Sequence, residues 1–404
     1  MTAFDPALSL SRRTAAVEEA AIIRMAQKAR DLKAAGQDVV SLTIGEPDFD
    51  TPAHIRAAAT RAMEAGFTHY GPVAGFPELR AAISKKLKEE NGIDCPPAGI
   101  VMANGAKQAI TNACFAVLDP GDEVIMLAPF WAAYEGIVRM AGGVPVVLHA
   151  GLDEGFKVPA SRIAAAMSER TKLVMINTPC NPSGAMFDRA ELAAIAAAIA
   201  AHPHALVLAD EIYEYIAFDA APSSIAALAG MAARTITVNG FSKGFAMTGW
   251  RLGWGATAAE PVARAMAKVQ GAFTAGPNAF VQQAAIAALE GPRDEVARMR
   301  ATYQRRRDVI VDLLAAMPGV RVYRPAGTFY VFPEVSALLG RTAGNHRIDT
   351  VEDLCDWLLD AHKVATVPGT AFGDARSIRL SFATTEAEIR KGLARLAEAV
   401  AQLS

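Results

Sequence analysis

The sequence has little of what marks a membrane, secreted or metal-binding protein. No apolar run approaches the roughly 18 residues that a membrane-spanning helix needs, and the longest, at 192–201, ends at His202-Pro203. The four cysteines lie far apart without a C-x-x-C pair, which argues against a disulfide framework or a zinc site. The first residues contain no apolar segment of the kind found in a secretory signal. We therefore expect a cytoplasmic protein with no metal and no membrane partner.

An excess of one charge sign is also missing. Forty basic and 42 acidic residues leave a net charge of −2 over 404 residues, so no electrostatic attraction to nucleic acid is expected. Apolar residues make up 52% and charged residues 20%, which excludes intrinsic disorder for most of the chain. The nucleotide-binding patterns G-x-G-x-x-G and the P-loop are absent. What remains is a folded globular protein, long enough for more than one domain.

Short apolar runs rich in β-branched residues recur through the middle of the chain. Because they do not alternate with polar residues, they predict strands covered on both faces, in a mostly parallel sheet with crossover helices between strands. The fold class is therefore α/β, and ligands should bind beyond the carboxyl ends of the strands. After a charged helix at about 290–320, whose Arg305-Arg306-Arg307 we expect on a solvated face, an α+β pattern predicts a second, smaller domain. The six runs are 100–103, 123–127, 144–148, 173–176, 205–209 and 235–238.

Turns rich in glycine, asparagine and proline follow two of these runs. The sequence Asn-Gly-Ala-Lys-Gln at 104–108 follows the first run and opens a helix. A glycine there allows close approach of a ligand, and the free N–H groups of a helix start attract an anion such as phosphate. The segment 177–184 follows the fourth run and would hold a side-chain amide at the sheet edge. Taken alone, either segment is also compatible with an ordinary structural turn.

A carboxylate and a lysine follow two further runs. Asp210 stands where the fifth run ends, and a carboxylate there either needs a partner or caps a helix. After the sixth run, Lys243 is an amine that can form a Schiff base with a carbonyl when its ammonium form is disfavoured. Arg251, eight residues later, can bind a phosphate as a charge-assisted fork. A lysine Schiff base, a phosphate cradle and a carboxylate for a ring nitrogen together describe a pyridoxal phosphate site.

The same region permits a second interpretation. The residues at 240–244 match the G-x-S-x-G nucleophile elbow of α/β serine hydrolases, which would make Ser242 a nucleophile. It would need a downstream histidine, for instance His346 or His362. This remote alternative requires a helix directly after the serine, where a turn-like Met-Thr-Gly-Trp-Arg stands, and it leaves Lys243 without a role.

Several strings together resemble class I/II pyridoxal phosphate-dependent aminotransferases. They occur in the family's order from about residue 8 to residue 400, and they look most like the bacterial aspartate aminotransferase subgroup. The resemblance implies the fold type I architecture, with a mostly parallel seven-stranded sheet in a large domain at 50–320. Residues 1–49 and 321–404 would form one discontinuous small domain. The strings are Leu-Thr-Ile-Gly-Glu-Pro-Asp-Phe-Asp-Thr-Pro at 42–52, Tyr-Gly-Pro-Val-Ala-Gly-Phe-Pro-Glu-Leu-Arg at 70–80, Asn-Pro-Ser-Gly at 181–184, Asp-Glu-Ile-Tyr at 210–213, Asn-Gly at 239–240, Ser-Lys-Gly-Phe-Ala-Met-Thr-Gly-Trp-Arg-Leu-Gly at 242–253 and Ile-Arg-Leu-Ser-Phe at 378–382.

The resemblance also implies roles for individual residues. Lys243 would form the Schiff base and move the proton of the substrate Cα, while Asp210 would pair with the ring nitrogen. Arg379 would grip the substrate α-carboxylate as a fork, helped by Asn181 and the backbone of Gly45. The other implied contacts are Tyr213 and Asn181 on the ring hydroxyl, Trp131 and Ile212 on the ring faces, Gly105, Ala106, Lys107, Ser242 and Arg251 around the phosphate, Lys107 and Trp131 on the substrate, and Tyr70 from the other subunit of a homodimer.

The implied reaction moves an amino group between an L-amino acid and a 2-oxo acid such as 2-oxoglutarate. Lys107 fits recognition of a distal carboxylate, which favours aspartate as the donor. In an ungapped alignment, however, Ile22 and Glu18 stand where the subgroup has a threonine and a basic residue, so an aromatic or other apolar donor is a further possibility. Gly240 replaces a serine that often donates to the phosphate. A β-lyase of the same fold is the alternative, because it also begins with removal of the Cα proton.

Overall fold

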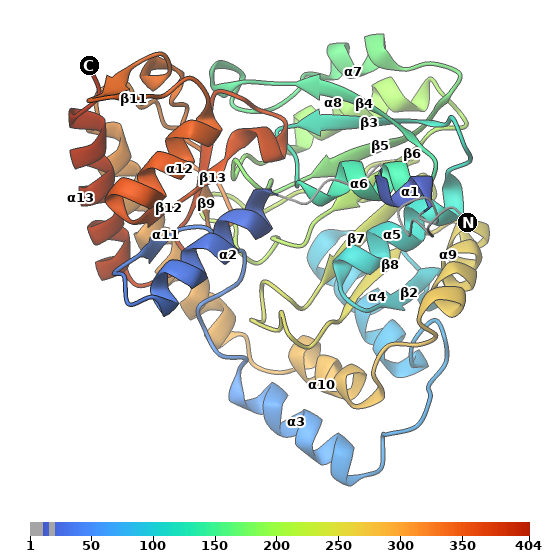
Figure 1. Cartoon of the computed structure of the whole chain (residues 1–404). Coiled ribbons are helices and arrows are strands. Elements are labelled where there is room, and N and C mark those ends of the chain that lie inside the picture. Colours follow the sequence, from blue (N-terminus) through green and yellow to red (C-terminus); the bar gives the residue numbers. More distant parts are fainter. Residues whose placement is uncertain (1–10, 16–20) are drawn as a thin grey trace, which may run out of the picture.

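A computed structural model describes residues 11–15 and 21–404 of the chain (Figure 1). Within these residues, seven strands form one sheet in the order β2-β8-β7-β6-β5-β3-β4. Neighbouring strands are parallel except that β8 runs antiparallel to both β2 and β7. This mixed, mostly parallel sheet confirms the predicted α/β class. The strands are β2 Ile100–Ala103, β3 Glu123–Ala128, β4 Val144–His149, β5 Thr171–Asn177, β6 Leu206–Asp210, β7 Thr235–Gly240 and β8 Gly253–Ala256.

Helices cover both faces of this sheet, which explains why its strands are apolar without alternation. Along β3, Val124 and Met126 join a buried cluster with α5, α6 and α9 on one face, and Ile125 joins a cluster with α7 and α8 on the other. Beyond one end of the sheet, α3 packs against α10, as does α4. These helices are α3 Ala53–Glu64, α4 Pro77–Asn91, α5 Ala106–Val117, α6 Ala133–Met140, α7 Ala160–Ala166, α8 Arg189–Ala200, α9 Glu260–Phe273 and α10 Ala279–Glu290.

Apart from α1, which contacts α6, elements near the two ends of the described chain lie together. Strand β1 near the start pairs in parallel with β12 near the end, through Val40 opposite Val364, and β14 pairs with both β9 and β13. Figure 1 shows α2, in blue, beside the orange and red elements. The division at residues 50 and 320 stays a prediction, which these contacts support. The elements are α1 Arg12–Ala15, α2 Ala21–Ala34, β1 Val40–Ser41, α11 Asp294–Ala315, β9 Tyr330–Val331, β10 Thr342–Ala343, β11 His346–Arg347, α12 Val351–His362, β12 Val364–Ala365, β13 Val367–Pro368, β14 Ile378–Ser381 and α13 Glu386–Ala401.

Helix α11 departs from the expectation of a solvated basic face. Its Arg307 is almost fully buried, where it forms ion pairs with Asp219 and Asp308 and stacks on the ring of Phe218 at 4.9 Å. A buried guanidinium needs such partners because an unpaired charge in the interior is costly. The prediction was therefore wrong for Arg307, which joins α11 to the 217–219 segment. Within residues 11–15 and 21–404, no helix combines the length and apolarity needed to cross a bilayer.

Candidate active site

A cavity of about 680 Å³ opens where the carboxyl ends of the sheet strands meet α2, β9, β14 and the segment after β1. Among the predicted site residues, Gly105 and Tyr70 do not line it, and Glu18 lies outside the described residues. Gly105 adjoins the cavity through Arg251, whereas Tyr70 is 97% exposed on this chain. The predicted residues that line the cavity are Ile22, Gly45, Ala106, Lys107, Trp131, Asn181, Asp210, Ile212, Tyr213, Ser242, Lys243, Arg251 and Arg379.

Asp210 ends strand β6 as a buried carboxylate with two hydrogen-bond donors. Its Oδ2 accepts from the hydroxyl of Tyr134 at 2.6 Å, and its Oδ1 accepts from the N–H of Ile212 at 3.2 Å. Burial raises the pKa of Asp210 to about 6, although the Tyr134 hydrogen bond and the charge of Lys243 oppose this rise. A cationic group in the cavity would relieve this desolvation. The sequence analysis did not predict Tyr134 as a site residue. Its position three residues after Trp131 is the one feature of the sequence that points to the site.

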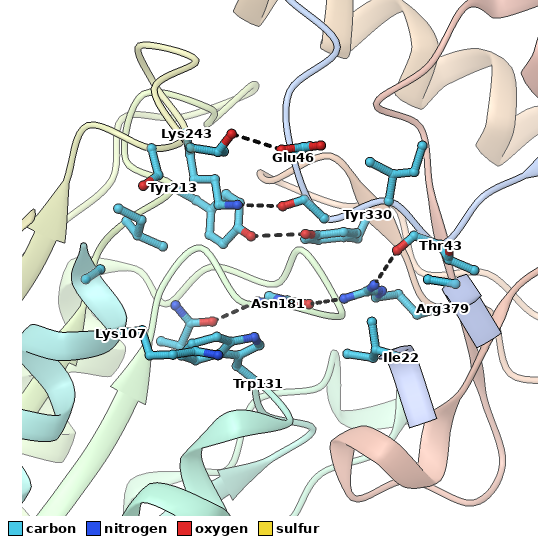
Figure 2. A pocket seen from close by; sticks show the side chains of 18 of the residues that line it. Ile22, Thr43, Glu46, Lys107, Trp131, Asn181, Tyr213, Lys243, Tyr330 and Arg379 are labelled. Atoms are coloured by element: carbon cyan, nitrogen blue, oxygen red, sulfur yellow. Dashed lines mark hydrogen bonds between the residues drawn. The ribbon is translucent and has the colours of Figure 1, made fainter. Parts of the chain in front are cut away.

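Lys243 follows β7 and reaches across the cavity to the segment after β1. Its Nζ donates to the carbonyl oxygen of Gly45 at 2.5 Å and lies 5.9 Å from the ring centre of Tyr213 (Figure 2). Desolvation lowers the pKa of Lys243 to about 8, and the nearby carboxylate of Glu46 opposes this effect. With this pKa, roughly a tenth of the amine is uncharged at pH 7, compared with well under a thousandth for an ordinary lysine, and the uncharged form is the one that attacks a carbonyl.

The turn between β2 and α5 forms a cationic cradle. Gly105 has φ of 90°, and a Cβ atom there would lie 2.6 Å from Nη2 of Arg251, so the guanidinium packs directly on the glycine. That guanidinium donates to the carbonyl oxygens of Thr248 and Asn104 at 2.9 and 3.3 Å. Helix α5 begins at Ala106, and the first N–H groups of a helix lack intrahelical partners. Burial and the charge of Arg251 lower the pKa of Lys107. These groups suit a bound phosphate.

Close packing accounts for the absence of a serine at Gly240. A Cβ atom there would lie 2.9 Å from both the Cα of Gly253 and the carbonyl oxygen of Leu252, in the neighbouring strand segment. The two backbones therefore approach too closely for a side chain unless one of them moves. The hydroxyl that Gly240 lacks cannot be restored here without widening the pairing of β7 with β8.

Arg379 lies on β14, opposite the cradle. Its Nη1 donates to Oδ1 of Asn181 at 3.1 Å and its Nη2 donates to the carbonyl oxygen of Thr43 at 2.9 Å. The guanidinium carbon is 4.3 Å from the ring centre of Tyr330, and the buried Nε has no partner within the described residues. Tyr330 also lies 3.2 Å from Tyr213, hydroxyl to hydroxyl. The sequence analysis missed Tyr330, because only the folded chain brings β9 to the cavity. A fixed, buried fork of this kind suits a carboxylate.

Side-chain geometry does not favour the serine hydrolase alternative. Ser242 lines the cavity, but the two candidate histidines, His346 and His362, do not, and both pack against Trp357 of α12. A turn and no regular helix follows Ser242. The described residues contain no cluster of three or more His, Cys, Asp or Glu side chains suited to a metal ion.

The residues of the cavity fit pyridoxal phosphate. The cationic cradle at Gly105 and Arg251 matches its phosphate, and the desolvated carboxylate of Asp210 matches a protonated ring nitrogen. Lys243 has a partly neutral amine between them, and Figure 2 shows Trp131 and Lys107 facing Ile22 and Arg379 across the remaining space.

Known proteins agree with this assignment. Residues 37–396 match the family described as aminotransferase class I and II. The chain is 43% identical to the aspartate/prephenate aminotransferase of Cereibacter sphaeroides over 98% of this chain and 99% of that protein. It is 42% identical to the aspartate/prephenate aminotransferase of Thermus thermophilus over 96% of this chain and 98% of that protein. Among solved structures, the aspartate aminotransferase from Rhizobium meliloti superposes with a TM-score of 0.95 at 39% sequence identity. The match covers 98% of this chain and 99% of that one.

These similarities extend over nearly the whole of each chain. They confirm the expected enzyme class, fold and cofactor together, because the structural neighbours share the architecture as well as the sequence. The chain therefore belongs to the class I and II aminotransferases, which are pyridoxal phosphate-dependent transaminases.

Proposed function

We propose that this aminotransferase takes its amino group from a dicarboxylic L-amino acid, with aspartate favoured, and delivers it to a 2-oxo acid such as 2-oxoglutarate. The observation that carries the proposal is one cavity that holds Lys243, Asp210 and Arg379 together with Lys107, which has no ion-pair partner within the described residues. The similar proteins from Cereibacter sphaeroides and Thermus thermophilus are named for aspartate and prephenate, which supports a dicarboxylic substrate.

Each residue then has a defined task. Pyridoxal phosphate, when bound, supplies an electrophilic carbon and a conjugated ring that withdraws electrons from the substrate α-carbon. Lys243 would hold it covalently and, once displaced by the substrate amine, carry the α-proton. Asp210 would keep the ring nitrogen protonated, because its carboxylate is desolvated and forms no ion pair within the described residues, although the charge of Lys243 acts on it. Arg379 would orient the substrate through its carboxylate, and Asn181 fixes that guanidinium.

The remaining predicted contacts are those that the family resemblance implies. They are Tyr213 and Asn181 near the ring hydroxyl, Trp131 and Ile212 on the ring faces, Gly105, Ala106, Lys107, Ser242 and Arg251 around the phosphate, and Gly45 beside the substrate carboxylate. All of them lie in the cavity or, for Gly105, against a residue that lines it.

Lys107 favours an acidic amino donor, whereas Ile22 favours an apolar one. The Nζ of Lys107 lies 5.0 Å from the Trp131 ring centre, and its desolvation favours a substrate that brings a negative charge. Ile22, from α2, adds an apolar wall to the same cavity. Lys107 decides the preference because a desolvated charge is costly without a counter-charge, whereas Ile22 already packs against apolar neighbours whichever donor binds. Aspartate is therefore preferred, and an aromatic or other apolar donor is the second candidate.

We also propose a cytoplasmic homodimer with shared active sites. Tyr70, Phe67 and Val73 are exposed in one segment of this chain, and that segment packs against the end of α9, where Phe273 is 55% exposed. A second copy covering this surface would bury these rings and could bring Tyr70 to the partner's phosphate. The four cysteines are unpaired buried thiols, as is usual in a reducing compartment.

A panel of amino donors tests the substrate assignment. Aspartate, glutamate, phenylalanine, leucine and alanine are each assayed against 2-oxoglutarate, with the wild type, Lys107→Met and the exposed control Lys268→Met. We expect aspartate to lead, and, at saturating pyridoxal phosphate, Lys107→Met to lower kcat/KM for aspartate by roughly 10- to 100-fold and that for leucine far less. Equal losses of kcat/KM for all donors would show that Lys107 does not distinguish the side chains of the donors. Release of pyruvate and ammonia from a cysteine conjugate, without amino transfer, would favour the β-lyase.

A further inference from the structure

The phosphate turn is held in place by a side chain that does not line the cavity. Gln108, in the first turn of α5, folds back so that its Oε1 accepts from the backbone N–H of Asn104 at 2.8 Å. Its Nε2 donates in the other direction, to Oγ1 of Thr274 at 2.8 Å. One side chain therefore ties the turn before α5 to the end of α9.

A buried polar network extends this connection. Gln270 is fully buried, and its Nε2 donates to Oγ1 of Thr274 at 2.9 Å and to the carbonyl oxygen of Ala275 at 2.7 Å. Its Oε1 accepts from Nδ2 of Asn112, itself fully buried on α5, at 2.6 Å. Buried polar side chains are costly unless they are paired, so this network specifies one arrangement of α5 against α9.

The turn has backbone hydrogen bonds, such as that from the Gly105 N–H to the carbonyl oxygen of Ala103 at 2.8 Å, but no side-chain cap of its own. Gly105 occupies the position before α5, where a side chain would ordinarily cap the helix, and it offers no capping atom. The buried Oδ1 of Asn104 has no partner within the described residues. The Asn104 N–H is fixed by Gln108, and the Asn104 carbonyl oxygen accepts from Arg251. Gln108 and Arg251 thus fix the backbone N–H and the carbonyl oxygen of Asn104, respectively.

The far end of the network reaches the proposed subunit surface. Thr274 follows directly after Phe273, one of the exposed rings there. A Cβ atom on Gly276 would lie 2.8 Å from the carbonyl oxygen of Pro72, and one on Gly271 would lie 3.4 Å from Cγ1 of Val73. The end of α9 therefore packs against the segment that carries Tyr70.

We propose that Gln108 is a positioning residue for the cofactor phosphate, acting with Thr274 through the backbone of the Asn104–Ala106 turn. This inference rests on the proposed site of pyridoxal phosphate. Gln108 does not line the cavity, so it can act on a bound phosphate only through the turn that it supports. It should therefore influence a ligand that carries a phosphate and not one that lacks it.

The test compares two ligands that differ only in the phosphate. Binding of pyridoxal phosphate and of pyridoxal is measured by absorbance titration of cofactor-depleted wild type, Gln108→Met, Thr274→Val, their double variant and the exposed control Gln37→Met. We expect Gln108→Met, which keeps the side-chain volume, to weaken pyridoxal phosphate binding about tenfold and to leave pyridoxal binding unchanged. The double variant should lose no more than Gln108→Met alone, since both act through one connection.

Several outcomes would overturn the proposal. Equal weakening of both ligands would mean that Gln108 supports the whole site and not the turn. Unchanged pyridoxal phosphate binding in Gln108→Met would refute it directly, as would fully additive losses in the double variant. If the wild type itself bound no pyridoxal phosphate, the proposed cofactor site would fail, and that result is separate from any effect of the variants.

Discussion

Replacing Asp210 by asparagine should stabilise the cofactor-free protein and damage the enzyme. In the absence of cofactor, burial raises the pKa of this carboxyl from 3.8 to about 6, so its ionised form is disfavoured in the folded state. Each pKa unit corresponds to about 1.36 kcal/mol, so ionised Asp210 costs about 3 kcal/mol of folding stability at neutral pH. An amide of the same shape can still accept from the Ile212 N–H and face the Tyr134 hydroxyl.

The sign of the pH dependence follows from the raised pKa. The stability that protonated Asp210 contributes is fully present below about pH 4 and is lost as the pH rises through about 6. The advantage of Asp210→Asn should therefore grow between these values and stay constant above them. With about 2.1 cal/mol/K of unfolding entropy per residue over 404 residues, about 3 kcal/mol shifts the melting midpoint by roughly 3–4 °C.

Calorimetry of the cofactor-free proteins at pH 4, 6 and 8 measures this shift, with the exposed Asp312→Asn as control. Addition of pyridoxal phosphate should stabilise the wild type more than Asp210→Asn, because only the carboxylate gains an ion pair with the ring nitrogen. Transamination by the variant should be far slower at saturating cofactor. A variant that is less stable than wild type at pH 8, or whose gain is the same at all three pH values, would refute this account of Asp210.

Two further perturbations address other buried charges. Arg379→Lys loses the guanidinium fork that donates to Asn181 and Thr43. Because every donor and acceptor carries the α-carboxylate, kcat/KM should fall roughly 10- to 100-fold for all of them. A loss for one substrate only would contradict a shared carboxylate site. Burial raises the pKa of Glu211 to about 8, so the stability its proton contributes is lost as the pH rises from about 4.5 through 8. Glu211→Gln should therefore melt progressively above wild type from pH 5 to pH 9, and a pH-independent difference would count against a buried carboxyl.

The sheet was predictable because its strands are buried on both faces. The six apolar runs became β2 to β7, each within about two residues of its predicted ends, since continuous hydrophobicity is required wherever helices cover both sides. Strand β8 was missed because Gly253-Trp-Gly-Ala is short and half glycine, which lowers strand propensity. Its backbone packs so closely on β7 that Gly240 and Gly253 exclude side chains there.

The candidate site was predictable only where chemistry is local in sequence. Lys243 and Asp210 stand at strand ends within recognisable strings, but nothing in the sequence connects Tyr134 to Asp210, or Tyr330 to Arg379. These partners come from other elements and are brought together by folding. For Arg307 the sequence pattern was misleading. Three consecutive arginines suggest an exposed face, but in the folded chain Asp219 lies beside Arg307 and allows it to be buried.

The identity of the covalently bound lysine tests the central claim most directly. The protein loaded with pyridoxal phosphate is reduced with borohydride, digested and analysed by mass spectrometry, alongside Lys243→Ala and the control Lys268→Ala. We predict that the cofactor is attached to Lys243 in the wild type and the control, and that Lys243→Ala retains none and loses transamination by about 10²–10⁴-fold or more, since it lacks both the attachment point and the proton carrier. Attachment at another lysine, or wild-type turnover by Lys243→Ala, would contradict the account.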